Sequence, residues 1–93
     1  MPYYKNLTTL VMHHCGLNKE DSKSMSSLFD KIENCIYLDL RYNKLDFEIV
    51  VNFLNKLPDL NYLFIKRNSE REHYYVELLR NNEYRGLVDP WDP

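Results

Sequence analysis

The sequence predicts an α/β fold in which three parallel strands form a sheet and helices cover its outer face. In three short segments the apolar residues alternate with period two, which is typical of strands with one buried face. Between these segments apolar residues recur at i, i+3, i+4 and i+7, which indicates amphipathic helices. Each connection is long enough to hold a crossover helix, so we expect parallel strands and a right-handed coil.

The chain has 93 residues, and we expect a single domain over residues 1–93. Within it we expect an N-terminal cap at 1–6, three repeats over 7–82, and a C-terminal cap or tail at 83–93. Hydrophobic residues at 44% and charged residues at 28% exclude wholesale disorder. The net charge of −2 argues against a general nucleic-acid coat protein, which would be strongly basic.

Residues 7–17, 35–45 and 60–70 carry one pattern, L-x-x-L-x-[apolar]-x-x-[N/C]-x-L, although the second copy begins with Cys35 and the third lacks its last leucine. The aligned strand leucines are Leu10, Leu38 and Leu63. This pattern resembles the leucine-rich repeat family, and repeats of about 25–28 residues are most similar to its ribonuclease-inhibitor-type branch. The resemblance covers residues 7 to about 82. It implies a short solenoid with helices on the outer face.

The predicted helices have matching apolar stripes. The first stripe is Met25, Leu28, Phe29 and Ile32, and a shift of 25 residues gives Val50, Phe53, Leu54 and Leu57. A further shift gives Tyr75, Leu78, Leu79 and Asn82, so that the third helix loses its stripe only at its end. We expect Asn18 or Asp21 to cap the first helix and Asp46 to cap the second. Pro58 should close the second helix.

The ninth position of each repeat has a structural role of its own. An asparagine there can bond backbone groups where the chain leaves the strand, and Asn43 and Asn68 fit this role. The family resemblance implies that a small residue such as cysteine can replace this asparagine, and Cys15 occupies the ninth position of the first repeat. We expect Cys15 and Cys35 to be buried free thiols, because two cysteines without a secretory signal are typical of a reducing compartment.

Both ends of the stack need protection, because a terminal repeat would otherwise expose its apolar face. Residues 2–4, Pro-Tyr-Tyr, are expected to cover the first repeat. Val88 lies 25 residues after Leu63, but Pro90 occupies the place of Ile65 and cannot donate to a strand ladder. We therefore expect the repeat to stop there. The tail with Trp91 then either caps the last repeat or acts as a short linear binding motif.

The sequence contains no combination of residues that predicts catalysis. There is no G-x-S-x-G element, no nucleophile beside a base and no paired carboxylates in a cleft. The run His13-His14-Cys15 is a poor metal site, since consecutive strand residues point to opposite faces. We therefore expect a protein that is not an enzyme and that uses no metal and no other cofactor.

The most informative predicted surface is the exposed face of the sheet. The family resemblance implies that residues flanking the buried leucines line a concave face where ligands bind. One side of this face is aromatic and the other is cationic. The residues predicted to contact a partner are His13, Tyr37, Asp39, Arg41, Tyr42, Tyr62, Phe64, Lys66 and Arg67, together with Trp91 in the tail.

Tyrosine and arginine are enriched in protein-binding hot spots, so we expect a non-catalytic module that binds another protein through this face. The alternative is a structural subunit of a ribonucleoprotein or another large assembly that contacts RNA through the basic stripe. A third interpretation is an exposed sheet that binds no ligand, because tyrosine is also a good strand former. We expect no membrane contact. The expected location is the cytoplasm, and a nuclear location is also compatible with the sequence. The exposed end of the stack allows a homodimer.

Overall fold

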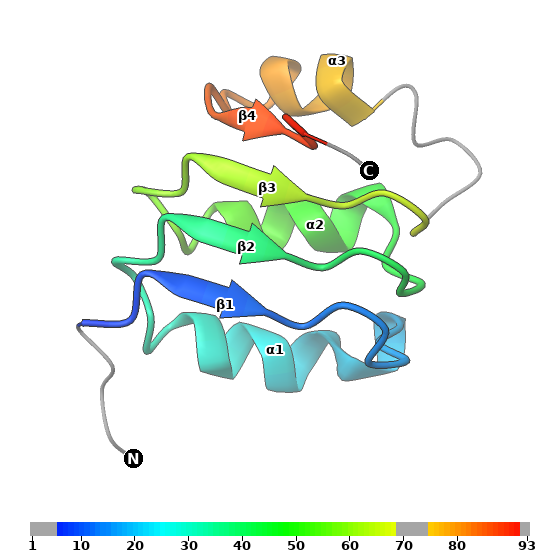
Figure 1. Ribbon diagram of the computed structural model, residues 1–93. Coiled ribbons are helices and arrows are strands. Elements are labelled where there is room, and N and C mark those ends of the chain that lie inside the picture. Colours follow the sequence, from blue (N-terminus) through cyan, green and yellow to red (C-terminus); the bar gives the residue numbers. More distant parts are fainter. Residues whose placement is uncertain (1–5, 69–74, 92–93) are drawn as a thin grey trace.

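The computed structural model describes residues 6–68 and 75–91, which form four parallel strands and three α-helices. The strands lie side by side in sequence order (Figure 1): β1 (Thr9–Val11), β2 (Tyr37–Asp39), β3 (Tyr62–Phe64) and β4 (Leu87–Val88). Each of the first three strands is followed by a helix, in the order α1 (Ser22–Phe29), α2 (Phe47–Leu54) and α3 (Tyr75–Asn81). A short 3-10 helix, η1 (Lys19–Asp21), leads into α1.

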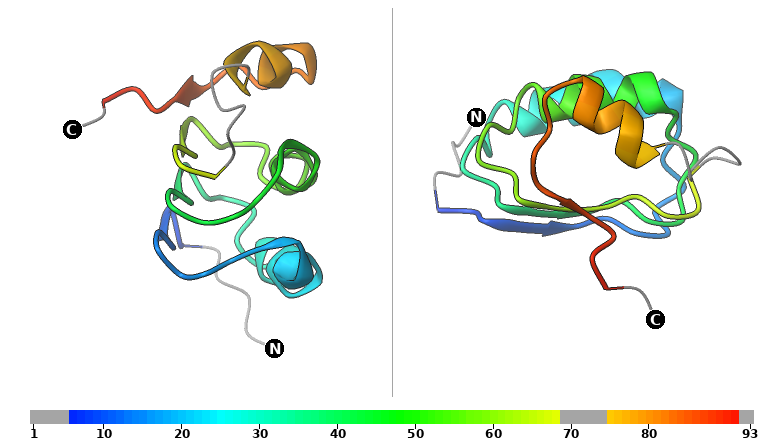
Figure 2. Two further views of the ribbon diagram at one scale, coloured as in Figure 1. Left: turned by 90° about the vertical axis from the view of Figure 1, so that its right-hand side faces the viewer. Right: turned by 90° about the horizontal axis from the view of Figure 1, so that it is seen from above.

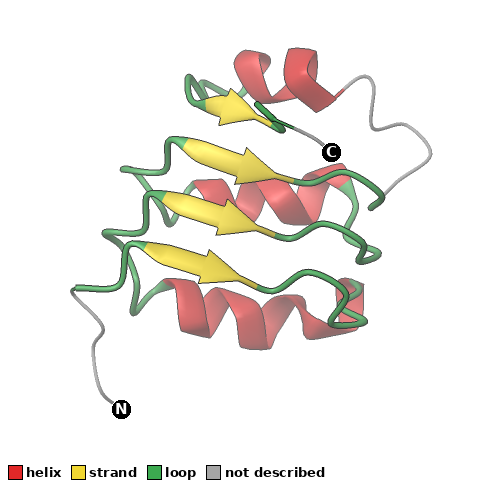
Figure 3. Ribbon diagram, in the orientation of Figure 1, coloured by secondary structure: helices red, strands yellow, loops and turns green. Residues whose placement is uncertain are grey.

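The described residues form two layers. Seen from the side, the three helices lie on one face of the sheet, and the C-terminal segment leaves β4 on the other side (Figure 2). Loop and helix alternate with strand along the chain (Figure 3). Within the described ranges, no helix covers the second face, which we call the open face. We define it by the first and last residues of β1, β2 and β3 and the first residue of β4, namely Thr9, Val11, Tyr37, Asp39, Tyr62, Phe64 and Leu87.

The strands pair in the register that the repeat predicts. Leu10 lies opposite Leu38, which lies opposite Leu63, and this alignment continues to Val88. Leu38 and Leu63 are fully buried, so one apolar residue of each central strand points toward the helices. The prediction of three strands is wrong by one, because residues Leu87–Val88 pair with β3 before Pro90 ends the ladder.

The helices bury the predicted stripes against the sheet. The buried helical positions are Met25, Phe29, Val50, Phe53 and Leu79. The rings of Phe29 and Phe53 meet edge to face, with centroids 4.7 Å apart, and join the first two helices. The helices end at Phe29 and Leu54, so Ile32 and Leu57 enter the core from the loops that follow. The core is therefore continuous between the helices and the sheet.

Side chains cap the starts of η1 and α2. The Asn18 side chain accepts a hydrogen bond from the Glu20 amide at 2.8 Å, and Asp21 accepts one from the Asn18 amide at 2.9 Å. This reciprocal pair is a capping box at the start of η1. Asp46 accepts a hydrogen bond from the Ile49 amide at 3.1 Å and caps α2. The predicted capping role of Asp46 is confirmed. Asn18 caps η1 rather than α1, and Asp21, the N-cap residue of α1, makes no side-chain capping bond.

A tight turn connects α3 to β4. The Arg80 guanidinium donates hydrogen bonds to the carbonyl oxygens of Tyr84 and Gly86, at 2.9 and 2.7 Å. The Tyr84 hydroxyl donates to the Leu87 carbonyl at 2.9 Å, and burial raises the pKa of Tyr84 to about 12. A Cβ at Gly86 would overlap the Tyr84 hydroxyl and lie 2.8 Å from the Asn61 carbonyl oxygen. Only glycine fits this approach.

Asp89 directly follows β4 and takes part in hydrogen bonding at the end of the sheet. In the preceding pair of strands, the Leu40 amide donates to the Phe64 carbonyl at 2.8 Å. At the corresponding place beside β4, the Ile65 amide donates to the Asp89 carboxylate at 3.1 Å. The side chain of Asp89 thus replaces a ladder carbonyl just before Pro90. The sequence analysis assigned no role to this aspartate.

Some expectations concern residues that lie outside the described ranges. The predicted N-terminal cap at residues 2–4 lies there, as does the segment 69–74 of the third repeat. In the part of the chain that is described, no helix is both long enough and apolar enough to cross a membrane.

Leu40 is fully buried in the middle of the core. We expect Leu40→Ala to lower the free energy of unfolding by about 2–5 kcal/mol, because it removes apolar contacts and leaves a cavity. Urea unfolding measures this change. Val11→Ala is the control, since Val11 is 51% exposed and should cost no more than about 0.5 kcal/mol. Equal effects of the two substitutions would contradict the described core.

Candidate functional site

Four aromatic rings meet on the open face. Tyr37 and Tyr62 are neighbours in adjacent strands, with ring centroids 6.1 Å apart, and the Tyr37 and Phe64 centroids are 4.9 Å apart. Trp91, which follows β4, packs against Tyr62 at 5.7 Å and Phe64 at 5.3 Å. We call Tyr37, Tyr62, Phe64 and Trp91 the aromatic cluster. Tyr37, Tyr62 and Phe64 were predicted on the exposed face and Trp91 in the tail, and the structure brings all four rings together.

Exposure differs sharply within the aromatic cluster. Phe64 is only 1% exposed, so the expectation of a solvent-accessible ring at this position is wrong. The ring is covered because Trp91 and Tyr37 pack against it. Trp91 is 55% exposed and is the outermost ring of the aromatic cluster. A partner at this surface would therefore meet Trp91 and the edges of the half-buried tyrosines.

Two apolar side chains extend this surface along the sheet. Val11 lies opposite Asp39 on the outer strand β1, and Leu87 lies opposite Tyr62 on β4. Both side chains are among the exposed large hydrophobic residues. Exposed apolar groups therefore occur on both edge strands of the open face, with the aromatic cluster between them. The sequence analysis did not include Val11 and Leu87 among the predicted contacts, although their register positions could have indicated them.

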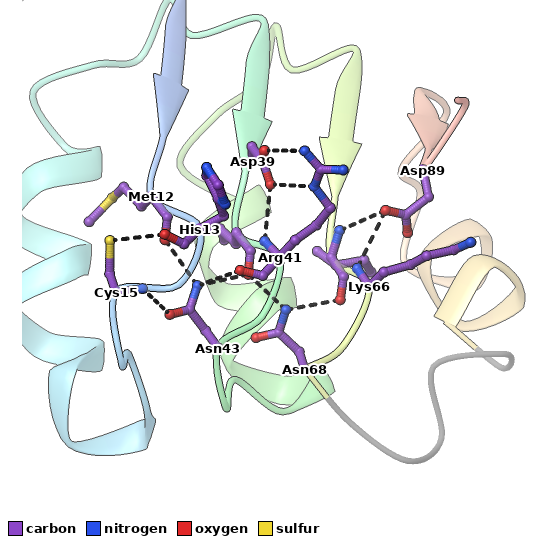
Figure 4. A network of polar contacts seen from close by, with 11 residues as sticks. Met12, His13, Cys15, Asp39, Arg41, Asn43, Lys66, Asn68 and Asp89 are labelled. Carbon is purple, nitrogen blue, oxygen red and sulfur yellow. Dashed lines mark hydrogen bonds and ion pairs between the residues drawn. The ribbon is translucent and has the colours of Figure 1, made fainter. Parts of the chain in front are cut away.

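Asp39 and Arg41 form an ion pair (Figure 4). The Arg41 side chain donates to both carboxylate oxygens of Asp39, through Nε at 3.0 Å and through a terminal nitrogen at 2.8 Å. The guanidinium carbon also lies 5.3 Å from the centroid of the Phe64 ring. Asp39 was predicted to contact a partner, but it is only 2% exposed and offers little surface for a direct contact. Its carboxylate instead holds Arg41 in place.

The charge state of Asp39 reflects two opposing effects. Burial alone raises the pKa of this carboxyl group, because it disfavours the ionised form. Hydrogen bonds from the Arg41 side chain and backbone, together with the guanidinium charge, outweigh burial. The pKa of Asp39 therefore lies below its ordinary value, and the pair is ionic at neutral pH.

Asn43 lies at the turn after β2, and its side chain forms hydrogen bonds with the turn that follows β1 (Figure 4). Its side-chain oxygen accepts hydrogen bonds from the amides of Cys15 and Leu17, at 3.1 and 3.0 Å. Its side-chain nitrogen donates to the carbonyl oxygens of Met12, Leu40 and Arg41. These bonds satisfy backbone groups that no strand ladder reaches. The predicted role of Asn43 is confirmed.

Asn68 repeats this arrangement one unit later. Its oxygen accepts a hydrogen bond from the Leu45 amide at 3.0 Å, and its nitrogen donates to the carbonyls of Leu40 and Ile65. Cys15, at the same place in the first repeat, is exposed, and its sulfur lies 3.5 Å from the His13 carbonyl oxygen. The expectation of a buried Cys15 is therefore wrong.

Cys35 is the buried cysteine. Both cysteines are free, and the Cys35 thiol donates to the Tyr37 carbonyl oxygen at 3.3 Å. Burial raises the pKa of the Cys35 thiol. A raised pKa keeps the group protonated and unreactive, which is consistent with a packing role.

Three residues after the strands have left-handed backbone conformations. His14, Tyr42 and Arg67 occupy the eighth position of successive repeats, and their φ angles are 55°, 59° and 66°. The rings of His14 and Tyr42 stack with centroids 4.2 Å apart and planes 11° from parallel. A surface groove of about 380 Å³ lies beside them. We call it the turn groove; its lining residues are His14, Gly16, Asn18, Tyr42, Asn43, Lys44 and Arg67.

The predicted partner residues thus separate into two places. Tyr37, Tyr62, Phe64 and Trp91 form the aromatic cluster, whereas Tyr42 and Arg67 line the turn groove. His13, Arg41 and Lys66 occupy the seventh position of the repeats, between these two places in the sequence. Lys44, which also lines the turn groove, was not among the predicted partner residues. The tenth position of the repeat, directly after Asn43, could have indicated it.

The site offers non-covalent contacts: aromatic surface on the open face and hydrogen-bond donors in the turn groove. The rings of His13 and His14 lie edge to face with centroids 5.7 Å apart. Among residues 6–68 and 75–91, no group of three His, Cys, Asp or Glu side chains could hold a metal ion. Comparisons of the chain with protein-family models, curated proteins and solved structures found no match.

We expect Asn43→Ala to lower the free energy of unfolding by about 1–3 kcal/mol, because the substitution leaves buried backbone groups without partners. Chemical denaturation measures the change. Asn52→Ala is the matched control, since Asn52 is exposed within α2 and alanine is a good helix former. A neutral Asn43→Ala would show that the asparagine bonds do not hold the turns.

The ion pair predicts a pH dependence of stability. The pKa of Asp39 is lowered in the folded protein, so its ionised form stabilises the fold above the unfolded pKa of about 3.9. This contribution is lost as the pH falls through the folded pKa. We expect the stability difference between wild type and Asp39→Asn to be constant near neutral pH and to shrink below about pH 4. Urea unfolding at several pH values measures it, and a difference that persists unchanged at about pH 2 would contradict the pairing.

Proposed function

We propose that the chain is a short right-handed leucine-rich-repeat solenoid that binds another protein through its open face and performs no catalysis. The repeat pattern of the sequence supports the family resemblance. The in-register parallel strands and the helices on a single face are compatible with it. In such an architecture each repeat contacts only its neighbours, and the strand faces form one extended binding surface.

The aromatic cluster is the observation that carries the proposed binding function. Trp91 is more than half exposed although it packs on two other rings. Tryptophan, tyrosine and arginine dominate protein-binding hot spots, since they combine large area with few rotatable bonds. The surface holds all three residue types, with Arg41 fixed beside Phe64.

The rigidity of this surface supports binding as well. Tyr37 and Tyr62 extend from paired strands, and the Asp39 carboxylate orients Arg41 through two hydrogen bonds. Side chains that are already ordered lose little conformational entropy when a partner docks. The exposed apolar groups of Val11 and Leu87 add area at the two ends of the surface.

The alternative function is that of a structural subunit of a ribonucleoprotein that contacts RNA. Lys44 and Arg67 beside the stacked rings of the turn groove favour it. Binding of this kind weakens steeply with salt because phosphate contacts release counterions. A salt titration with single-stranded RNA therefore distinguishes the two functions.

The proposal places the protein in a reducing compartment, the cytoplasm or the nucleus, because both cysteines are free. It includes neither a cofactor nor a membrane partner. A homodimer through an end of the stack is compatible with the position of β1 and β4 at the two edges of the sheet.

We expect Trp91→Ala to abolish capture of a protein that the wild-type chain retains from a nuclease-treated extract. Truncation of a hot-spot tryptophan typically costs about 2 kcal/mol or more, which corresponds to about thirtyfold in Kd. Val76→Ala is the matched control, because Val76 is an exposed apolar residue on α3, in the helical layer. Titration of the purified partner against both variants measures the effect.

Circular dichroism and thermal unfolding are the controls that test whether each variant remains folded. Equal affinity of wild type and Trp91→Ala for the captured partner would contradict binding through the open face. Capture of a protein from an untreated extract but not from the nuclease-treated extract would favour the RNA-binding alternative.

A further inference from the structure

A second surface groove lies at the opposite end of the strands from the turn groove. It is lined by residues of the α2–β3 loop (55–61) and of the α3–β4 loop (82–86), together with Ile36 and Leu54. These loops lie where the strands begin (Figure 1). The volume of the groove is about 690 Å³, which is within the range of pockets that bind ligands. We call it the loop groove.

A change in strand pairing accompanies the loop groove. Before β3, the amides of Asn61 and Tyr62 both donate to the Ile36 carbonyl. Before β4, among the described residues, only the Leu87 amide donates to the corresponding carbonyl of Asn61. The loop before β4 is instead bonded to α3 through the Arg80 side chain. This looser pairing leaves room for the groove between the two loops.

Glu83 departs from the local preferences of a helix end. It follows α3, and its φ angle is 72°. The amides of Glu83 and Tyr84 donate to the carbonyls of Arg80 and Leu79, which is the Schellman pattern, and glycine usually occupies its left-handed position. A Cβ atom is strained in this conformation, and a carboxylate is also unfavourable at the negative end of a helix dipole. A residue that breaks two local preferences indicates a functional role.

Negative charge prevails in the loop groove. Asp59 and Glu83 are exposed, and in the described part of the chain neither side chain takes part in a hydrogen bond or an ion pair. The negative dipole ends of α2 and α3 also lie at the groove. Arg85 is the cation among the described lining residues, and its guanidinium donates to the carbonyl oxygens of Arg80 and Tyr84, at 2.8 and 3.3 Å. The groove therefore favours a cationic ligand.

The remaining lining residues favour a peptide over a small free cation. Ile36 is 40% exposed, and Pro58 is exposed as well. The methylene stems of arginine and lysine pack on apolar surface of this kind while their charged ends reach polar groups. The exposed amide side chains of Asn55 and Asn61 can both donate to and accept from a peptide backbone. The mixed lining therefore suits a peptide with basic side chains.

We propose that the loop groove is a second docking site, which takes a basic peptide segment of a protein partner. Asp59 and Glu83 pair with arginine or lysine side chains of that segment, and a neighbouring apolar side chain covers Ile36. The site goes beyond the proposed binding through the open face, because no residue of the aromatic cluster lines this groove.

Two variants each remove one carboxylate with little risk to the fold. Glu83→Gly places glycine at the left-handed position, and Asp59→Asn keeps the size of an exposed side chain. Glu48→Gln is the matched control, because Glu48 is exposed in the first turn of α2, at the opposite end of that helix from the groove. The probes are a fluorescently labelled Gly-Arg-Leu-Arg-Gly peptide, the corresponding Gly-Glu-Leu-Glu-Gly peptide, and spermine as an unlabelled competitor. Fluorescence anisotropy at low salt measures their affinity for the full chain.

We expect the basic peptide to bind and the acidic peptide not to bind. Asp59→Asn and Glu83→Gly should each weaken binding about fivefold, the upper range for an exposed ion pair, whereas Glu48→Gln should leave it unchanged. Arg85→Gln should tighten binding about twofold because it removes a like charge, and partial unfolding cannot explain such a gain. Glu83→Gly should not lower the melting temperature, since glycine relieves the backbone strain.

Four results would each overturn the inference. They are no binding of the basic peptide, unchanged affinity in both Asp59→Asn and Glu83→Gly, an equal loss of affinity in Glu48→Gln, and full displacement of the peptide by equimolar spermine. Trp91→Ala separates this site from the open face. It should leave binding of the basic peptide unchanged, and a loss of binding in Trp91→Ala alone would place the peptide on the open face instead.

Discussion

The side chain of Asn43 joins two consecutive strand–helix units, and the register of the whole sheet depends on such joints. The strands β1 to β3 have only three residues each, so few ladder hydrogen bonds define their alignment. Asn43 adds bonds to the amides of Cys15 and Leu17 and to three carbonyls. A slip of one residue would turn Leu38 toward solvent and expose the core. A slip would also break the hydrogen bonds of the Asn43 side chain, which makes the shifted register energetically unfavourable.

The functional surface follows from this register. Paired strands place Tyr37 beside Tyr62, and the chain after β4 brings Trp91 onto them. On the same face a buried carboxylate, Asp39, neutralises Arg41 and keeps its guanidinium near Phe64. A buried ion pair of this kind contributes more to orientation than to net stability. The open face is therefore an ordered aromatic surface rather than a set of independent side chains.

Much of the fold could be predicted from periodicity, because the leucine alignment and the Asn43 turn depend only on spacing along the chain. The predictions failed where a residue outside the strand decides the outcome. Phe64 and Asp39 occupy the open face as expected, but Trp91 covers one and Arg41 the other. The fourth strand is followed by Asp89, whose carboxylate replaces a backbone carbonyl. The spacing of apolar residues along the chain does not predict these side-chain contacts.

Amide hydrogen exchange measured by NMR tests the central claim, which is that side-chain bonds at the turns hold the units in register. The amides of Cys15 and Leu17 lie outside the strands and donate to the Asn43 side chain, whereas those of Met12 and Leu40 belong to the strand ladder. We expect all four to exchange with similar protection, since they open only when the units separate. Exchange of Cys15 and Leu17 at the rate of an unstructured peptide, with Met12 and Leu40 still protected, would contradict the claim.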